Sequence, residues 1–129
     1  MTKELKLRIK IKAELEDVYA ALINPFAIEL WSGFPAKMSI ESNSEFELWG
    51  GDICGRNIAF EENSFLVQEW YFGDQSEKSI VTIKLFKQGV KTQVDVHHTN
   101  IPDEAFEDIK EGWEESYLGA VKEFLEVDS

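Results

Sequence analysis

The sequence predicts an α+β fold in which one long C-terminal helix packs on an antiparallel β-sheet. Its 129 residues are the size of one domain, so we treat residues 1–129 as a single domain. Short strand-like segments follow one another from residue 37 to residue 99. Beyond Pro102 the apolar residues take the helical period and keep it to about Val127. A run of strands followed by one terminal helix is typical of an antiparallel sheet with its helices on one side.

Residues 5–12 predict the first strand. Its apolar residues alternate with basic ones, which places Leu5, Leu7, Ile9 and Ile11 on one face and Lys6, Arg8, Lys10 and Lys12 on the other. One face is then buried and the other solvated, as antiparallel sheets allow. The basic face would either dock an acidic partner or pair with acidic neighbours such as Asp95 across the strands, and we favour the pairing.

Two short helices are predicted next. Residues 13–22 have helical spacing at Leu15, Val18, Tyr19 and Leu22. Residues 24–31 predict a second helix, since Asn24 and Pro25 are residues that begin helices.

Six more strands are predicted after Pro35, at residues 37–42, 45–50, 52–62, 65–72, 79–86 and 91–99. With the first strand they make seven. Turn signals separate most of them, and Gly50–Gly51 suits a two-residue hairpin. Residues 73–78 read as a polar loop.

The last helix has two different flanks on a helical wheel. An apolar, largely aromatic stripe contains Phe106, Ile109, Trp113, Tyr117, Ala120, Val121 and Phe124. A stripe of small residues beside it contains Ala105, Gly112, Ser116 and Gly119. We expect the small stripe to admit a neighbouring backbone. The aromatic stripe either fills a plain core, as such stripes usually do, or lines a gap and stacks on a guest.

At this point the residues show a family resemblance. The chain resembles small members of the "activator of Hsp90 ATPase homologue 1-like" family, within the Bet v 1-like (START-like) superfamily. The resemblance is carried by residues 13–33, 46–57, 66–72, 79–85, 94–102 and 112–125, and most specifically by Trp31-Ser32-Gly33, Trp70 and Gly112-Trp113. It implies a helix-grip fold: a curved seven-stranded antiparallel sheet around the long C-terminal helix, with two short helices after the first strand. It also implies a cavity for apolar or aromatic small molecules.

The candidate ligand-binding residues are Trp70, His98, Trp113, Tyr117 and Phe124. The aromatic side chains would supply stacking surface. Strand alternation puts His98 inward with Val94 and Val96, and His97 outward. His98 also falls on a histidine position common in the family; it would contact a polar ligand group, act as a base, or be a satisfied core histidine. If Trp113 lines an open cavity, we expect Trp113→Ala to cost near 2 kcal/mol, below the roughly 3–5 kcal/mol of a plain core tryptophan.

No catalytic constellation is evident. Adjacent histidines on opposite strand faces cannot share a metal, and the sequence has no HExxH, GxSxG or P-loop motif. Cys54 is the single cysteine, so no CxxC pair exists. We therefore predict no cofactor and no metal, and favour a non-enzyme, with a cyclase- or hydrolase-like activity of the superfamily as an alternative.

The composition and charge of the chain disfavour some classes of binding partner. The net charge of −12 disfavours nucleic acid and anionic membranes. No apolar run predicts membrane insertion and no signal peptide is evident, so a cytoplasmic location is the default. The main functional prediction is a domain that binds an apolar or aromatic small molecule between sheet and helix. The alternative is an Hsp90-type chaperone-associated interaction domain. Full-length eukaryotic activators carry a separate N-terminal chaperone-binding domain, so we expect this chain not to stimulate an Hsp90 ATPase as they do.

Overall fold

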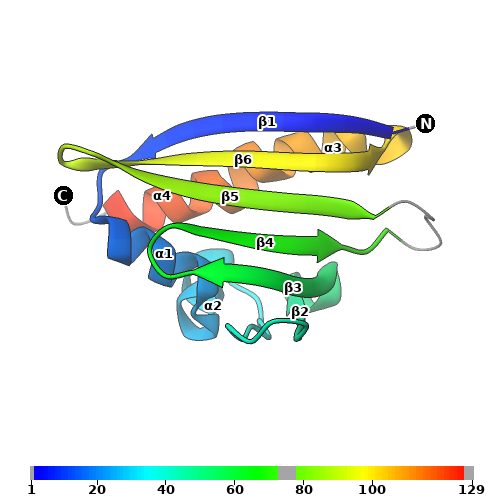
Figure 1. Cartoon of the computed structure of the whole chain (residues 1–129), viewed down its shortest axis with the longest axis horizontal. Coiled ribbons are helices and arrows are strands. Elements are labelled where there is room, and N and C mark those ends of the chain that lie inside the picture. Colours follow the sequence, from blue (N-terminus) through cyan, green and yellow to red (C-terminus); the bar gives the residue numbers. More distant parts are fainter. Residues whose placement is uncertain (1, 73–77, 127–129) are drawn as a thin grey trace.

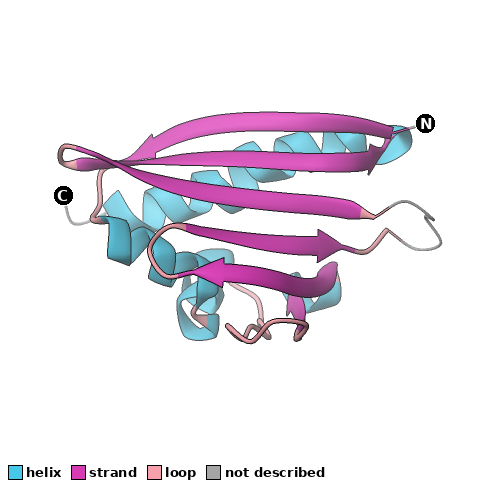
Figure 2. Ribbon diagram, in the orientation of Figure 1, coloured by secondary structure: helices cyan, strands magenta, loops and turns pink. Residues whose placement is uncertain are grey.

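The computed structural model describes residues 2–72 and 78–126, and it has the predicted α+β architecture (Figure 1). All helices lie on one face of a single antiparallel sheet (Figure 2). The strand order is β1-β6-β5-β4-β3-β2. The strands are β1 (Thr2–Ile11), β2 (Glu45–Leu48), β3 (Ile53–Glu61), β4 (Phe65–Trp70), β5 (Ser79–Gln88) and β6 (Lys91–Pro102). The helices are α1 (Leu15–Ile23), α2 (Pro25–Ser32), α3 (Phe106–Glu111) and α4 (Leu118–Glu126), with 3₁₀ turns η1 (Trp49–Gly51) and η2 (Asp103–Ala105) and a π turn, η3 (Gly112–Tyr117).

The first strand confirms the predicted alternation. Leu5 and Ile11 are buried on the helix side, while Lys6 and Arg8 are exposed on the other. β1 pairs with β6 in the sheet. On the outer face of these two strands, the Arg8 guanidinium binds the Asp95 carboxylate at 2.9 Å. The pairing interpretation of the basic face is therefore confirmed for Arg8.

The two short helices form where their sequence signals lie. The Asn24 side chain accepts hydrogen bonds from the backbone N–H groups of Phe26 and Ala27, and Pro25 occupies the first helical position. This cap satisfies donors that the first turn of a helix leaves unpaired. The Trp31 indole N–H then donates to the Ala21 carbonyl at 2.8 Å and fixes α2 against α1.

The predicted seventh strand, residues 37–42, is wrong. Only Lys37 pairs with the sheet edge, through an isolated bridge to Glu47. Further along, the Ser39 carbonyl accepts from the side chain of Asn57 and not from a strand N–H. Beyond Lys37, the segment is held at the sheet edge by a side chain and not by a strand ladder. The sheet therefore has six strands in the described residues.

The predicted two-residue hairpin at Gly50–Gly51 is also wrong. β2 ends at Leu48 and β3 begins at Ile53, so four residues join them. Trp49, Gly50 and Gly51 all have positive φ, at 53°, 66° and 104°. Such a φ is unusual for a bulky side chain such as tryptophan. This path carries the Trp49 ring out of the strand and onto the helix side of the sheet.

The terminal helical segment runs behind the sheet from Asp103 to Glu126 (Figure 1). It is interrupted by the π turn, which the 3.6-residue wheel did not predict. The extra residue of this turn brings both Tyr117 and Leu118 inward, and both are buried. The predicted end near Val127 and most of the predicted loop 73–78 lie outside the described residues. No helix of the described part is long and apolar enough to cross a membrane.

The small stripe of this helix has a different role from the predicted one. A Cβ on Gly112 would meet nothing within 4 Å, so no neighbouring backbone approaches there. A Cβ on Gly119 would lie 2.6 Å from the Glu114 carbonyl oxygen. The close contact is therefore within the helix, because the π turn brings the carbonyl five residues earlier against Gly119.

Candidate functional site

An aromatic cluster joins the sheet to the terminal helix. Trp70 on β4 stacks on Trp113 of the π turn, with ring centroids 5.0 Å apart and planes 17° apart. Tyr117 lies 4.4 Å from Trp113 and 5.1 Å from Trp31 of α2. Trp49 of the η1 turn reaches the same tyrosine at 5.6 Å. Four segments distant in sequence thus meet around the π turn.

The sheet makes room for the Trp70 ring. Its partners on the two neighbouring strands are the small residues Gly55 and Ser79. A Cβ on Gly55 would overlap the carbonyl oxygen of Glu69, so only glycine fits this close approach. The large ring can therefore lie over the sheet and stack on Trp113.

A chain of hydrogen bonds anchors Trp113 from beneath. Its indole N–H donates to Nδ1 of His98 at 3.1 Å. The other ring nitrogen, Nε2, lies 2.8 Å from the Ser79 hydroxyl, which donates to the Thr99 carbonyl at 2.8 Å. Since Nδ1 accepts and the hydroxyl proton is committed, the imidazole is neutral with its proton on Nε2.

Burial keeps His98 neutral. The residue is 0% exposed, and desolvation, together with the nearby His97, lowers the pKa of His98 to about 3. Both ring nitrogens are engaged, so His98 has no free position for a substrate proton. The inward direction predicted for His98 is confirmed, and its contacts are those of a core histidine that positions Trp113.

A second buried chain supports Trp70. Its indole N–H donates to Gln68 at 3.1 Å, and the Gln68 amide donates to Asn57 at 3.0 Å. Asn57 in turn donates to the Ser44 hydroxyl and the Ser39 carbonyl, both at 3.1 Å. Gln68 and Asn57 are fully buried, so these bonds satisfy polar groups that would otherwise be costly to bury.

A pocket of about 220 Å³ opens beside the aromatic cluster, between the η1–β3 edge of the sheet and the terminal helix. Its walls include four aromatic side chains and two carboxylates. The full lining is Trp49, Asp52, Ile53, Trp70, Asp108, Ile109, Gly112, Trp113, Ser116 and Tyr117. Four of these residues come from the π turn, the kind of helix interruption that is frequent at functional sites.

The Tyr117 hydroxyl is unusual within this lining. The residue is 2% exposed, and its hydroxyl is the one buried side-chain polar atom of residues 2–72 and 78–126 that lacks a hydrogen-bond partner. Burial raises the pKa of Tyr117 above the ordinary value, so the phenol stays protonated. An unpaired buried polar group destabilises a fold, so a partner supplied by a ligand would satisfy it.

The structure places three of the five predicted ligand-binding residues on this pocket: Trp70, Trp113 and Tyr117. His98 lies beneath Trp113 and outside the lining. Phe124 lies two turns beyond Tyr117, half-buried against the core and also outside the lining. Their roles toward a ligand stay predictions.

Sequence reasoning missed Trp49, Asp52 and Asp108 in the lining. Trp49 lay in a predicted strand and both aspartates looked solvated. The positive φ that redirects Trp49 had one sequence signal, the Gly50-Gly51 pair that follows it. No sequence signal placed Asp52 and Asp108 near each other, because their proximity depends on where the terminal helix crosses the sheet.

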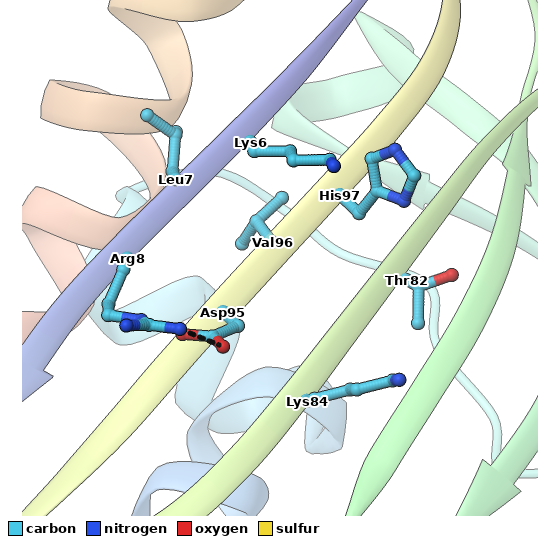
Figure 3. Close-up of a pocket in the computed structure, with 8 residues that line it drawn as sticks. All are labelled: Lys6, Leu7, Arg8, Thr82, Lys84, Asp95, Val96 and His97. Carbon is cyan, nitrogen blue, oxygen red and sulfur yellow. Dashed lines mark hydrogen bonds and ion pairs between the residues drawn. The ribbon is translucent and has the colours of Figure 1, made fainter.

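A larger hollow of about 480 Å³ lies on the opposite, outer face of the sheet (Figure 3). Lys6, Arg8, Lys84 and His97 surround it, and the Arg8–Asp95 ion pair lies across it. Its lysine and arginine side chains are exposed to solvent, and Asp95 and His97 are engaged by Arg8 and Glu4 at 2.9 and 2.8 Å. The helix-side pocket has buried aromatic walls and a buried polar group, so it is the candidate site.

Comparisons with known proteins agree with this fold. Residues 12–126 match the model of the family described as "Activator of Hsp90 ATPase homolog 1-like protein". Over 131 residues, covering 99% of the chain, it is 30% identical to the "Activator of 90 kDa heat shock protein ATPase homolog" of Dictyostelium discoideum. The chain spans only 34% of that relative's length.

Two solved structures show the same fold. The crystal structure of an HSP90 activator from Plasmodium falciparum has a TM-score of 0.84 at 20% identity, over 92% of each chain. A protein from Mesorhizobium loti has a TM-score of 0.85 at 20% identity, over 98% of this chain and 99% of that one. The family model and the Dictyostelium discoideum relative establish that the chain belongs to the Activator of Hsp90 ATPase homolog 1-like family.

Proposed function

We propose that this chain is a binding domain that holds a small apolar or aromatic molecule in the helix-side pocket. The observation that carries the proposal is the aromatic lining, in which Trp49, Trp70 and Trp113 surround a space of about 220 Å³. Concave, mostly apolar sites with a few polar groups are the usual form of small-molecule sites.

The backbone at Trp49 supports the same proposal. A tryptophan with a φ of 53° is held in a sparsely populated region, which costs of order 1–3 kcal/mol, and such residues cluster at ligand sites. Here the strained residue contributes its ring to the pocket wall. The buried chains through His98 and Gln68 hold the opposite wall rigid, so the pocket is preformed for a guest.

The test is a calorimetric titration of the purified chain with indole, a small neutral aromatic probe. We expect a saturable heat of binding, with affinity weakened by Trp49→Ala and unchanged by Phe86→Ala, since exposed Phe86 lies on the sheet away from the pocket. Native mass spectrometry of protein purified gently from its own host would identify a natural ligand. The absence of a saturable heat, or an affinity that Trp49→Ala does not alter, would refute the proposal.

A second candidate function is docking on an Hsp90-type chaperone. Two observations favour it. The Plasmodium falciparum protein is described as an HSP90 activator and the Dictyostelium discoideum protein as a homolog of such an activator, and α2 presents Phe26 and Leu30 at 77% and 72% exposure. These residues are one helical turn apart, so they lie on the same face of α2. Exposed apolar side chains that cluster in this way are typical of protein interaction sites.

Calorimetric titration of the chain into purified Hsp90 tests this candidate. We expect Phe26→Ser with Leu30→Ser to abolish binding, while Ile40→Ser, at an equally exposed position elsewhere, leaves it unchanged. Binding that is the same in all three proteins would exclude the α2 face as the docking site.

A further inference from the structure

The charged side chains that line the helix-side pocket are all negative. Its lining contains the carboxylates of Asp52 and Asp108 and no lysine, arginine or histidine. Neither carboxylate makes an ion pair or hydrogen bond within the described part of the chain. Both aspartates are exposed residues of the lining, in a protein whose net charge is already −12.

The walls between these carboxylates are aromatic faces. The quadrupole of a tryptophan or tyrosine ring attracts a cation placed over its face, and the attraction is stronger where water is excluded. Trp49, Trp70 and Tyr117 come from three different segments, so they can surround a guest on several sides. A positively charged head enclosed by rings would then be balanced by the two carboxylates of the lining.

The buried Tyr117 hydroxyl is a second, independent feature of the same lining. It has no hydrogen-bond partner among the described residues, so an ammonium N–H that reached its oxygen would satisfy it. An anionic ligand would be repelled by both carboxylates, and a neutral ligand would leave them unused. The space of about 220 Å³ is below the range usual for drug-sized ligands, which suits a compact head.

We propose that this pocket takes a compact alkylammonium group, held against the aromatic side chains of Trp49, Trp70 and Tyr117 and by the carboxylates of Asp52 and Asp108. The inference rests on the proposed function, because it names the chemical class of ligand for the same pocket. The positive group enters the aromatic enclosure, and any apolar remainder lies along Ile53 and Ile109.

The experiment compares choline with 3,3-dimethylbutan-1-ol, in which a carbon atom replaces the charged nitrogen of an otherwise similar shape. Both are titrated into the whole chain by calorimetry at low salt. We expect choline to bind about tenfold or more tightly than the neutral alcohol, as cation–π and carboxylate attraction together imply. D52N/D108N should remove most of this preference.

The matched control is E107Q/E115Q. It removes the same net charge from exposed helix positions outside the lining, so it should keep the preference for choline. If the alcohol binds as tightly as choline, the ammonium inference is overturned while the proposed binding function stands. If neither probe binds and indole also fails to bind, both are overturned. A preference for choline that E107Q/E115Q removes equally would assign it to the overall charge and overturn the inference.

Discussion

At the scale of single residues, His97 and His98 show how two identical side chains differ in exposure and contacts because their environments differ. They are neighbours in sequence, yet one is exposed beside Glu4 and the other is fully enclosed. The enclosed imidazole is neutral and accepts from Trp113. Its function is therefore to orient the tryptophan that stacks on Trp70.

His98 should make stability depend on pH. The unfolded chain binds a proton at His98 near the ordinary pKa of about 6.5, whereas the folded chain does so only near 3. Acid therefore favours unfolding: the contribution is complete above about pH 6.5 and is lost as the pH falls toward 3. The loss is about 1.4 kcal/mol per pH unit, or roughly 2 kcal/mol at pH 5.

The measurement is denaturant unfolding of the wild type and His98→Gln at pH 7.5 and pH 5. The free-energy difference between the two proteins should shrink by about 2 kcal/mol at the lower pH. Comparing the two cancels the carboxylates that titrate in the same range. An equal difference at both pH values would show that His98 is not shielded as described.

Tyr117→Phe should separate stability from binding. The buried hydroxyl has no hydrogen-bond partner in the part of the chain that the structure describes, so its removal should leave stability unchanged or raise it by about 1 kcal/mol. If the hydroxyl contacts the guest, the same change should weaken choline binding severalfold. Urea unfolding and calorimetry on one preparation give both values. A marked loss of stability would mean that the hydroxyl has a partner in the folded protein.

At the scale of elements, the π turn determines the shape of the site. It presents Gly112, Trp113, Ser116 and Tyr117 to the pocket together, which a regular α-helix would distribute differently around its axis. The turn requires glycine at position 119, because an added Cβ would lie 2.6 Å from the Glu114 carbonyl oxygen. The two glycines of this helix therefore have different roles.

Alanine substitutions should distinguish these two glycines. Gly112→Ala adds a methyl group to open space at a helical φ of −59°, so we expect stability to rise by about 0.5–1 kcal/mol. Gly119→Ala places a methyl group 2.6 Å from a backbone carbonyl, so we expect a loss of about 1–3 kcal/mol. Thermal unfolding of both variants measures the difference. Equal effects of the same sign would contradict the description of the π turn.

At the scale of the whole molecule, the aromatic cluster ties together the sheet, the short helices and the terminal helix. Trp113 is 2% exposed and contacts Trp70, Tyr117 and His98. This burial changes the expectation for Trp113 from that of a residue in an open cavity to that of a core residue. One wall of the pocket is thus also part of the core.

Trp113→Ala should therefore cost about 3–5 kcal/mol, the range for deleting a buried tryptophan, and not the smaller value of a cavity residue. It also leaves Nδ1 of His98 without its donor. Trp113→Phe is the control, because it retains an aromatic ring against Trp70 and should lose less. Denaturant unfolding with a constant m-value gives both numbers. A cost near 2 kcal/mol for the alanine variant would restore the open-cavity interpretation.

The sequence by itself determined the elements that depend on local periodicity. The alternation of β1 and the helical stripe after Pro102 reflect where consecutive Cβ atoms point, and the cap of α2 reflects the short reach from the Asn24 side chain to the N–H groups of the first turn. These patterns were sufficient for the α+β class, the inward direction of His98 and the contribution of Trp70, Trp113 and Tyr117 to one site. They persist in the structure because each is set by neighbours within a few residues.

Only the tertiary structure decided the path of the chain between and across these elements. Residues 37–42 have the pattern of a strand, yet side-chain bonds from Asn57 replace the ladder there. The π turn, which contains the buried Tyr117 and is followed by the buried Leu118, has no signal in the regular 3.6-residue period. The pocket itself depends on where Trp49, Asp52 and Asp108 meet, and contacts between distant segments leave no periodic signal in any one of them.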